Sequence, residues 1–452
     1  MAPNARAFAS AALCAALAAC ASYRAHPLSS RPALAPSVAA LDRTRPGAPP
    51  IPADRPLTLA ELSLLALNNS PDLRATRTQR GVASAQILQA GLLPDPVLSG
   101  SYGVLLAGPA VADAIGATLT ANLTAFITRP AQRAAAQAAA RQTDASIVWQ
   151  EWQAISRAQT LAIDLEEQAR LLRRLDDTLA LLRRRLALTR GALAQGNATL
   201  QDLAPDIAAV TSLETQRDAA RLAQDQRWQQ LDALLGLEPQ IRPPIATRLR
   251  VPAIPPAIAA ALLATLPDRR PDLVALQLGY AAAQARYRAS ILAQFPALTL
   301  GPNYGNDTSR VQSLGPAVSL TLPLFNRNRG QVAIARATRT QLREEYAARL
   351  ATASGGARAL LANLALLERQ RAAATAALPE AEALAANARR ALAAGMIDEL
   401  TYVQLETARL GAERRAIGLE QQVLDARTAL ATLLGAGLPP IRFTPATPAT
   451  LL

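Results

Sequence analysis

One stretch decides the fold because it occurs twice, first as SPDLRATRTQRGVASAQILQAGLLPDPVLSGSYG at residues 70–103 and again as RPDLVALQLGYAAAQARYRASILAQFPALTLGPNYG at residues 270–305. Tyr102 near the end of the first copy corresponds to Tyr304 in the second. The correspondence continues downstream at an offset of roughly 200 residues. We therefore interpret the chain as two copies of one structural unit.

Each copy is predicted to form a helix, two strands, a long helix, a tip and a further helix. The helices of the first copy are expected at 70–92, 128–195 and 203–236, with strands near 96–105 and 117–127. Those of the second copy are expected at 271–294, 329–394 and 403–434, with strands at 296–305 and 316–325. A helix of about 67 residues reaches about 100 Å. Two shorter helices stacked end to end nearly match it, which favours long helical hairpins.

The strands alternate between apolar and polar residues. Their apolar face, which we expect to contact the membrane, comprises Leu119, Leu123, Val318, Leu320, Leu322 and Leu324. About ten residues with this alternation are typical of an outer-membrane barrel strand. A soluble antiparallel hairpin with one hydrated face would show the same pattern. Four strands cannot close a barrel and open edges are not tolerated in lipid, so a membrane location requires oligomers.

Aromatic and basic residues mark the ends of the strands. Tyr102 and Tyr304 are placed as in an interfacial aromatic girdle. At the other end, TLPLFNRNRGQ (321–331) changes from apolar to basic, which places Arg327 and Arg329 where they can meet lipid phosphate. A solvated turn is the alternative.

The N-terminus has the layout of a secretory signal, with Arg6 followed by an apolar run that is too short to span a bilayer. Leu17-Ala18-Ala19-Cys20 resembles a lipobox, which makes Cys20 the acylated, palmitate-bearing first residue of a mature lipoprotein. An ordinary signal peptide is the alternative. The following Pro-rich residues are expected to form an extended tether.

These observations divide the chain into six parts. They are a signal peptide (1–19), a lipidated Pro-rich tether (20–56), a first repeat (57–237), a Pro-rich linker (238–256), a second repeat (257–436) and a Pro-rich C-terminal tail (437–452).

The composition excludes several function classes. All 47 basic residues are Arg, and they are scattered without aromatic platforms, so the net charge of +13 does not indicate nucleic-acid binding. No P-loop, Ser/His/Asp set or zinc-ligand spacing is present, so we expect no enzyme and no cofactor. His26 and Met396 are the only soft ligands besides Cys20 in the mature chain, so no metal site is expected.

Lipobox, duplicated unit, paired strands, long hairpins and Gly-marked tips together resemble the TolC-like outer-membrane efflux proteins. The resemblance implies an α+β membrane protein, a homotrimer with a 12-stranded barrel and a periplasmic α-helical barrel with coiled-coil packing. It implies a passive outer-membrane duct that docks on a periplasmic adaptor protein and an inner-membrane efflux pump. The run LPLFNRNRGQ is similar to the corresponding run in the branch of the family that exports heavy-metal cations. The resemblance does not determine whether the cargo is metal ions, drugs or other small molecules.

The tips concentrate the functional residues that the resemblance implies. ALAQG ends at Gly196 and ALAAG ends at Gly395. In the family, acidic side chains near the tips narrow the entrance and favour cations, which points to Asp202, Asp398 and Glu399. A trimer would bring together three copies each of Asp398 and Glu399, and these crowded like charges would raise the pKa values of the two residues. Solvated turn acids and helix-start acids are the alternative.

Two other classes of protein share some of these features. An adaptor-type periplasmic lipoprotein also has a long hairpin, but only one. A structural coiled-coil lipoprotein would have no use for the strand pairs.

Overall fold

The computed structural model describes residues 24–47, 49–108 and 112–439, which fall into two units. The first ends at Leu34, and in its described part the Ser29 hydroxyl donates to the carbonyl of Arg31. All elements below belong to the second unit, which begins at Ala35. The signal peptide and Cys20 lie outside the described residues.

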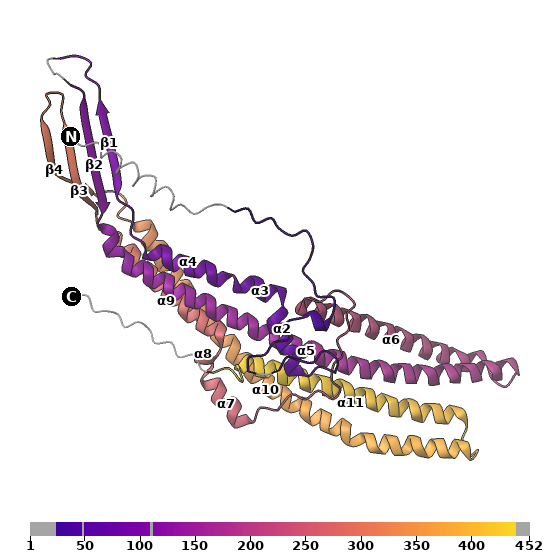
Figure 1. The fold of residues 1–452 in the computed structure, drawn as a ribbon. Coiled ribbons are helices and arrows are strands. Elements are labelled where there is room, and N and C mark those ends of the chain that lie inside the picture. Colours follow the sequence, from indigo (N-terminus) through magenta and orange to yellow (C-terminus); the bar gives the residue numbers. More distant parts are fainter. Residues whose placement is uncertain (1–23, 48, 109–111, 440–452) are drawn as a thin grey trace. The chain divides into compact units, whose positions relative to one another are not determined.

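The first repeat has the predicted element order (Figure 1). After a short 3₁₀ turn η1 (Val38–Ala40), its elements are α2 (Leu59–Asn69), α3 (Pro71–Arg77), α4 (Gln79–Gly91), β1 (Val97–Gly103), β2 (Ala114–Asn122), α5 (Thr124–Ala194) and α6 (Leu200–Leu235). The predicted helix 70–92 is split at Thr78, and α2 was not predicted. Helix α2 begins at a capping box in which Thr58 and Glu61 bond each other's backbone amides.

The second repeat has the same order after two short helices. Its elements are α7 (Pro256–Ala264), α8 (Leu266–Arg269), α9 (Pro271–Leu292), β3 (Ala297–Asn306), β4 (Gln312–Thr321), α10 (Arg329–Ala393) and α11 (Glu399–Leu434). The 71 residues of α5 and the 65 residues of α10 confirm the two long helices. A single residue separates α5 from β2, whereas a turn of seven residues, 322–328, separates α10 from β4.

The shorter helices stack end to end along the long ones, as predicted. In the first repeat, α6 ends at Gly236, where an added Cβ would lie 3.3 Å from the carbonyl oxygen of Asn69 at the end of α2. In the second repeat, α11 ends at Gly435. A Cβ added at Gly435 would lie 3.5 Å from the carbonyl oxygen of Arg269 at the end of α8. Both glycines have left-handed backbones, with φ of +68° and +60°. The sequence Leu-Leu-Gly, which occurs at 234–236 and again at 433–435, therefore marks the two helix junctions.

The largest core lies around these junctions. It is built from leucines of α2, α5 and α6, among them Leu62, Leu161 and Leu235. Ile51, from the segment expected to be an extended tether, is 4% exposed in the same core, and Leu57, at the start of the first repeat, is 1% exposed.

The prediction of an extended tether is therefore wrong from Ala35 onward. Ala35 forms a bridge with Leu237, and the Asn69 amide bonds both the N–H and the C=O of Asp42. The Pro-rich linker is likewise packed, since Leu57 bridges to Ile245. Proline removes backbone donors but leaves the apolar residues between prolines free to be buried.

The four strands form one antiparallel sheet in the order β1-β2-β3-β4. The central pairing, β2 with β3, joins the two repeats and sets Ala117 opposite Tyr304. Within the described residues, the outer edges of β1 and β4 have no partner strand. The sheet is thus built by both repeats and is open on both sides.

Candidate functional site

The sheet has one apolar face that runs across all four strands. The register aligns Leu98 with Leu119, Leu300 with Val318, and Tyr304 with Leu314. Most large apolar side chains of this face are exposed, while Leu298 is half-buried; the exposed ones are Leu98, Tyr102, Ile115, Leu119, Leu300, Tyr304, Leu314, Val318 and Leu320. Such a broad exposed apolar surface marks a membrane or protein contact.

The opposite face of the sheet carries mainly small or polar side chains. It carries alternate residues of the strands, including Ser99, Thr118, Asn303 and Ser319. The Thr118 hydroxyl donates to the side-chain oxygen of Asn303 at 2.7 Å, which links the two repeats across this face. Apolar and polar faces on one sheet are the arrangement of a barrel strand between lipid and a water-filled lumen.

Three of the predicted membrane-facing residues lie outside the strands. Leu123 is in helical conformation as the N-cap of α5, because the Asn122 side chain accepts the N–H of Thr124 and turns the chain. Leu322 and Leu324 follow the end of β4, where Pro323 has no N–H to continue the ladder. Leu119, Val318 and Leu320 lie within their strands as predicted.

A second set of exposed aromatic side chains lies at the base of the sheet, where strands meet helices. Phe126, Phe295 and Phe325 are 55%, 61% and 96% exposed. Tyr102 and Tyr304 lie near the other end of their strands. The strands therefore run between two aromatic levels, as in barrels with two interfacial girdles. Of the second level, only Phe325 lies within the run TLPLFNRNRGQ, while Phe126 and Phe295 were not predicted, because they come near the base of the sheet only when the chain folds.

The turn into α10 has an unusual backbone. Arg327 and Asn328 both have positive φ, at +46° and +52°. The Asn328 amide donates to the carbonyl of Ser290 in α9 at 2.9 Å, which holds the turn against the neighbouring helix. Arg327 and Arg329 are exposed, as a role at the membrane interface requires.

The first tip joins α5 to α6 through Gly196, whose φ is +75°. Asp202 closes a capping box there, since its carboxylate accepts the N–H and hydroxyl of Thr199 at 2.8 and 2.7 Å. These hydrogen bonds, led by the one from the Thr199 side chain, lower the pKa of Asp202.

The second tip joins α10 to α11 through Gly395, with φ of +67°. Asp398 is the N-cap of α11 and accepts the N–H of Thr401 at 2.8 Å, and hydrogen bonds with Thr401 lower its pKa. Glu399 pairs with Arg184 of α5 at 2.8 Å, so the second tip is tied to the first hairpin. The pKa values of Asp202 and Asp398 are thus lowered by hydrogen bonds within one chain, and the effect of a trimer on Asp398 and Glu399 stays a prediction.

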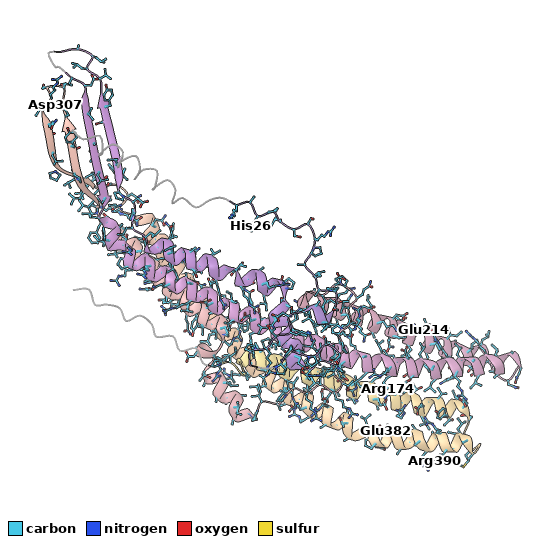
Figure 2. The ribbon with its side chains drawn as sticks, in the orientation of Figure 1. His26, Arg174, Glu214, Asp307, Glu382 and Arg390 are labelled. Atoms are coloured by element: carbon cyan, nitrogen blue, oxygen red, sulfur yellow. The ribbon has the colours of Figure 1, made fainter. Side chains whose placement is uncertain are left out.

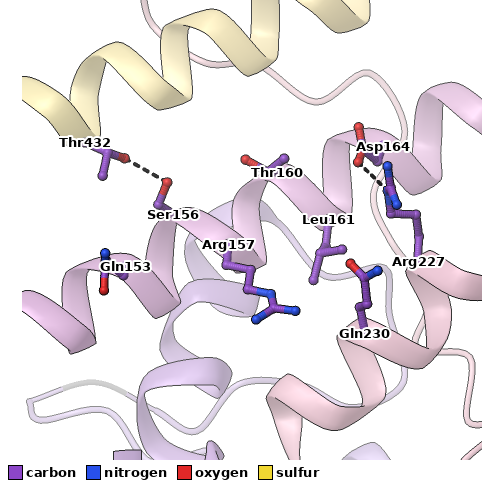
Figure 3. A pocket seen from close by; sticks show the side chains of 9 residues that line it. All are labelled: Gln153, Ser156, Arg157, Thr160, Leu161, Asp164, Arg227, Gln230 and Thr432. Carbon is purple, nitrogen blue, oxygen red and sulfur yellow. Dashed lines mark hydrogen bonds and ion pairs between the residues drawn. The ribbon is translucent and has the colours of Figure 1, made fainter. Parts of the chain in front are cut away.

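A buried carboxylate cluster near the middle of α5 was missed by sequence reasoning. Asp164 pairs with Arg227 of α6 at 2.7 Å and accepts from Gln421 of α11 at 2.6 Å. Figure 3 shows Asp164 and Arg227 in a shallow cavity of about 510 Å³, with Ser156 bonded to Thr432 beside them. The cluster thus joins α5 to both α6 and α11.

Burial raises carboxylate pKa values in this region. The pKa of Asp425 in α11 is raised to about 7 by burial and by the charge of Asp164. Burial and the neighbouring Glu166 raise the pKa of Glu167 to about 8. The sequence feature that could have predicted this cluster is LAIDLEEQAR (161–170), where three acidic residues stand among apolar residues of the helix. The described residues hold no group of three or more His, Cys, Asp or Glu side chains that could bind a metal ion.

Known proteins share this architecture. The chain superposes on the Campylobacter jejuni CmeC outer membrane channel with a TM-score of 0.70 and 16% identity, covering 92% of this chain and 95% of that one. It superposes on CusC, a protein that forms a transmembrane channel, with a TM-score of 0.66 and 19% identity, covering 91% and 99%. The fold is therefore that of the TolC-like outer-membrane channels.

Sequence comparison agrees with the fold. Residues 262–436 match the family model "Outer membrane efflux protein". The pyoverdine export outer membrane protein OpmQ of Pseudomonas putida is 28% identical over 267 residues, which are 56% of this chain and 55% of OpmQ. The matched region thus spans about half the length of this curated relative. The chain is thus similar to outer membrane efflux proteins over part of its sequence, and to outer-membrane channels in its fold.

Proposed function

We propose that this chain is the outer-membrane channel of a tripartite efflux system, a passive duct with no catalytic role. The observation that carries the proposal is the sheet with one apolar face, one polar face and two open edges, continuous with helices of 71 and 65 residues. A helix of that length reaches about 100 Å from the membrane.

The open edges support a homotrimer. The edge of β4 is free to pair with the β1 edge of a second copy, and three copies would then close a barrel of twelve strands. Closure removes every unpaired backbone group from the lipid. A periplasmic adaptor protein and an inner-membrane pump are the proposed partners at the tips.

The size of the folded assembly tests the proposal. We expect protein extracted from outer membranes to run as a detergent-stable trimer with mixed α and β circular dichroism, and to form channels in planar bilayers. A purely helical monomer would instead indicate the alternatives, an adaptor-type or a structural coiled-coil lipoprotein.

The cargo depends on the pump, and two classes are supported. OpmQ is named for export of pyoverdine, which suggests pyoverdine or a similar small molecule. The motif LPLFNRNRGQ suggests metal cations. Measuring both the sensitivity of a deletion strain to metal salts and its secretion of pyoverdine separates the two.

Asp202, Asp398 and Glu399 are the proposed entrance constriction between Gly196 and Gly395. Replacement by Asn, Asn and Gln keeps an oxygen acceptor for each cap but removes the charge. We expect the triple variant to lose cation preference in single-channel recordings. An Asp177→Asn/Glu344→Gln/Glu345→Gln variant removes the same charge from exposed positions elsewhere and serves as control. Unchanged conductance and ion preference in the tip variant would refute the constriction.

Cys20 is the proposed lipid anchor. The Cys20→Ala variant is expected to lose palmitate labelling and to leave the membrane fraction more readily, because only the barrel then holds it. Undiminished labelling would show that the acyl chain is elsewhere.

A further inference from the structure

The helical side of the sheet base is strongly basic. From Leu273 to Arg343 the sequence holds eight arginines and a single acidic residue, Asp307. Asp307 lies in the β3–β4 loop, at the opposite end of the strands (Figure 2). Seven of these arginines therefore lie near the base of the sheet or on the adjoining helices. Between residues 273 and 343, no acidic residue lies at this end of the sheet.

Two of these arginines line a groove between α9 and α10 of about 580 Å³. Arg329, Val332, Arg336 and Thr340 are spaced three or four apart and share one face of α10. Both guanidinium groups are exposed, and neither makes an ion pair or hydrogen bond with the described part of the chain. The groove thus offers two unneutralised cations beside apolar side chains.

The α9 wall of the groove is also suited to an amphipathic ligand. Tyr287 lines it, and its ring is stacked by Arg339 at 4.8 Å. Gln294 lines the end nearest the sheet and directly precedes the exposed Phe295. The groove therefore runs from apolar aromatic surface to charged surface.

The first repeat carries a similar site. Phe126, Arg129, Pro130 and Arg133 line a surface hollow of about 400 Å³ in the first turns of α5. Arg129 and Arg329 are separated by 200 residues, the offset of the duplication. The Nε atom of Arg129 is shielded from solvent without a hydrogen-bond acceptor among the described residues. A basic pocket beneath an exposed aromatic residue is thus present in both units.

The dimensions match the lipid boundary. Arg329 and Arg336 are two turns apart, which is about 10 Å along the helix. The headgroup region of one leaflet is roughly 5–8 Å thick. Both arginines therefore fit within reach of the phosphates when Phe295 and Phe325 mark the edge of the hydrocarbon.

We propose that the α9/α10 groove binds an anionic phospholipid of the inner leaflet of the outer membrane. Arg329 and Arg336 hold its phosphate, while an acyl chain lies toward Phe295 and Phe325. The inference rests on the proposed function, since it requires the sheet to be in the outer membrane.

Binding of phosphatidylglycerol to the purified full-length protein in neutral detergent tests this site, with phosphatidylcholine as the neutral lipid. The Arg329→Gln/Arg336→Gln variant is expected to bind phosphatidylglycerol about 25-fold more weakly, since each arginine contributes about fivefold. The control Arg358→Gln/Arg389→Gln removes the same charge from exposed positions of α10 outside the groove and should bind as the wild type does.

Three results would overturn the lipid site. One is equal affinity for phosphatidylglycerol in both variants and the wild type, and another is no preference over phosphatidylcholine. The third is full competition by inorganic phosphate at matched concentration, which would indicate a simple anion site. If instead the groove variant lost its trimeric state, with unchanged lipid affinity, a second copy would be the occupant.

Channel recordings separate this inference from the proposed function. A wild type that conducts, together with unchanged lipid affinity in the groove variant, refutes the lipid site alone. A wild type that forms no channel refutes the proposed function.

Discussion

The two long helices are copies of one pattern, yet they lie in very different surroundings. Helix α5 has 19 buried residues, whereas α10 has five: Ala353, Ala357, Leu364, Ala385 and Ala388. Helix α5 is packed by helices of both repeats, while α10 contacts mainly α9 and α11. The difference shows that duplication produced two equivalent elements, of which one became central and the other peripheral.

The exposed state of α10 is informative because the helix is not strongly polar. It contains an 18-residue window of mean hydropathy 1.3, of which 17% is buried. Leucines and alanines together supply this hydropathy, and small residues such as alanine allow close helix packing. An exposed Ala-rich helix next to the open strand β4 is consistent with the proposed contact with a second copy.

A charge placed in each helix gives the largest expected effect. Ala162→Glu in α5 buries a carboxylate at a site that is fully inaccessible, which costs several kcal/mol and should prevent folding. Ala373→Glu, at an exposed site of α10, should leave the circular dichroism of the protein unchanged. Equal loss of folded protein in both variants would contradict the difference in burial between α5 and α10.

The strands offer the next test. Leu320→Arg, on the apolar face of β4, should cost about 2–4 kcal/mol in the membrane and reduce assembled trimer in outer-membrane fractions. Ser319→Arg, on the polar face of the same strand, is the matched control and should assemble. A normal yield of Leu320→Arg trimer would contradict a lipid-facing sheet.

The two helix junctions should differ by a smaller amount. Gly236→Ala and Gly435→Ala both force a left-handed backbone on alanine, at about 1 kcal/mol each. Gly236→Ala also brings the new Cβ to 3.3 Å from Asn69, compared with 3.5 Å from Arg269 at Gly435. We therefore expect the lower unfolding temperature for Gly236→Ala, measured by thermal melts, with the reverse order contradicting this account.

The smallest effect concerns the carboxylates between the repeats. The folded pKa of Asp425 is about 7, above the ordinary value near 3.8, so the folded state binds more protons between these pH values. Stability must then fall as pH rises from about 4 to about 7. Asp425→Asn removes this loss and should raise the melting temperature at pH 8 by about 2 °C, with little change at pH 4.

The nearby charges identify the control for that measurement. Asp425 faces Asp164 of α5 and Arg227 of α6, which act on it in opposite directions. Asp177→Asn alters an exposed carboxylate of α5 and should leave the pH dependence unchanged. An identical pH profile for Asp425→Asn and the wild type would show that Asp425 is charged at neutral pH.

Local patterns explain which parts of the fold were predictable. The repeat, the two long helices and the alternation around Leu119 and Leu320 follow from spacing along the chain. The short helices α2, α7 and α8 were not predicted, and the burial of Ile51 was missed because prolines obscured the apolar residues between them. At the tips, Asp202 and Asp398 were identified by position, whereas their capping bonds appeared only with the backbone in place.

The sequence by itself determined the duplication, the length of the hairpins and the two-sided strands, because each is a periodic feature of neighbouring residues. Only the tertiary structure decided that the apolar faces of four strands join into one surface and that α5, not α10, is the central helix. It also decided that Asp164 meets Asp425 across the repeats. These outcomes depend on the register between segments about 200 residues apart, which no local pattern encodes.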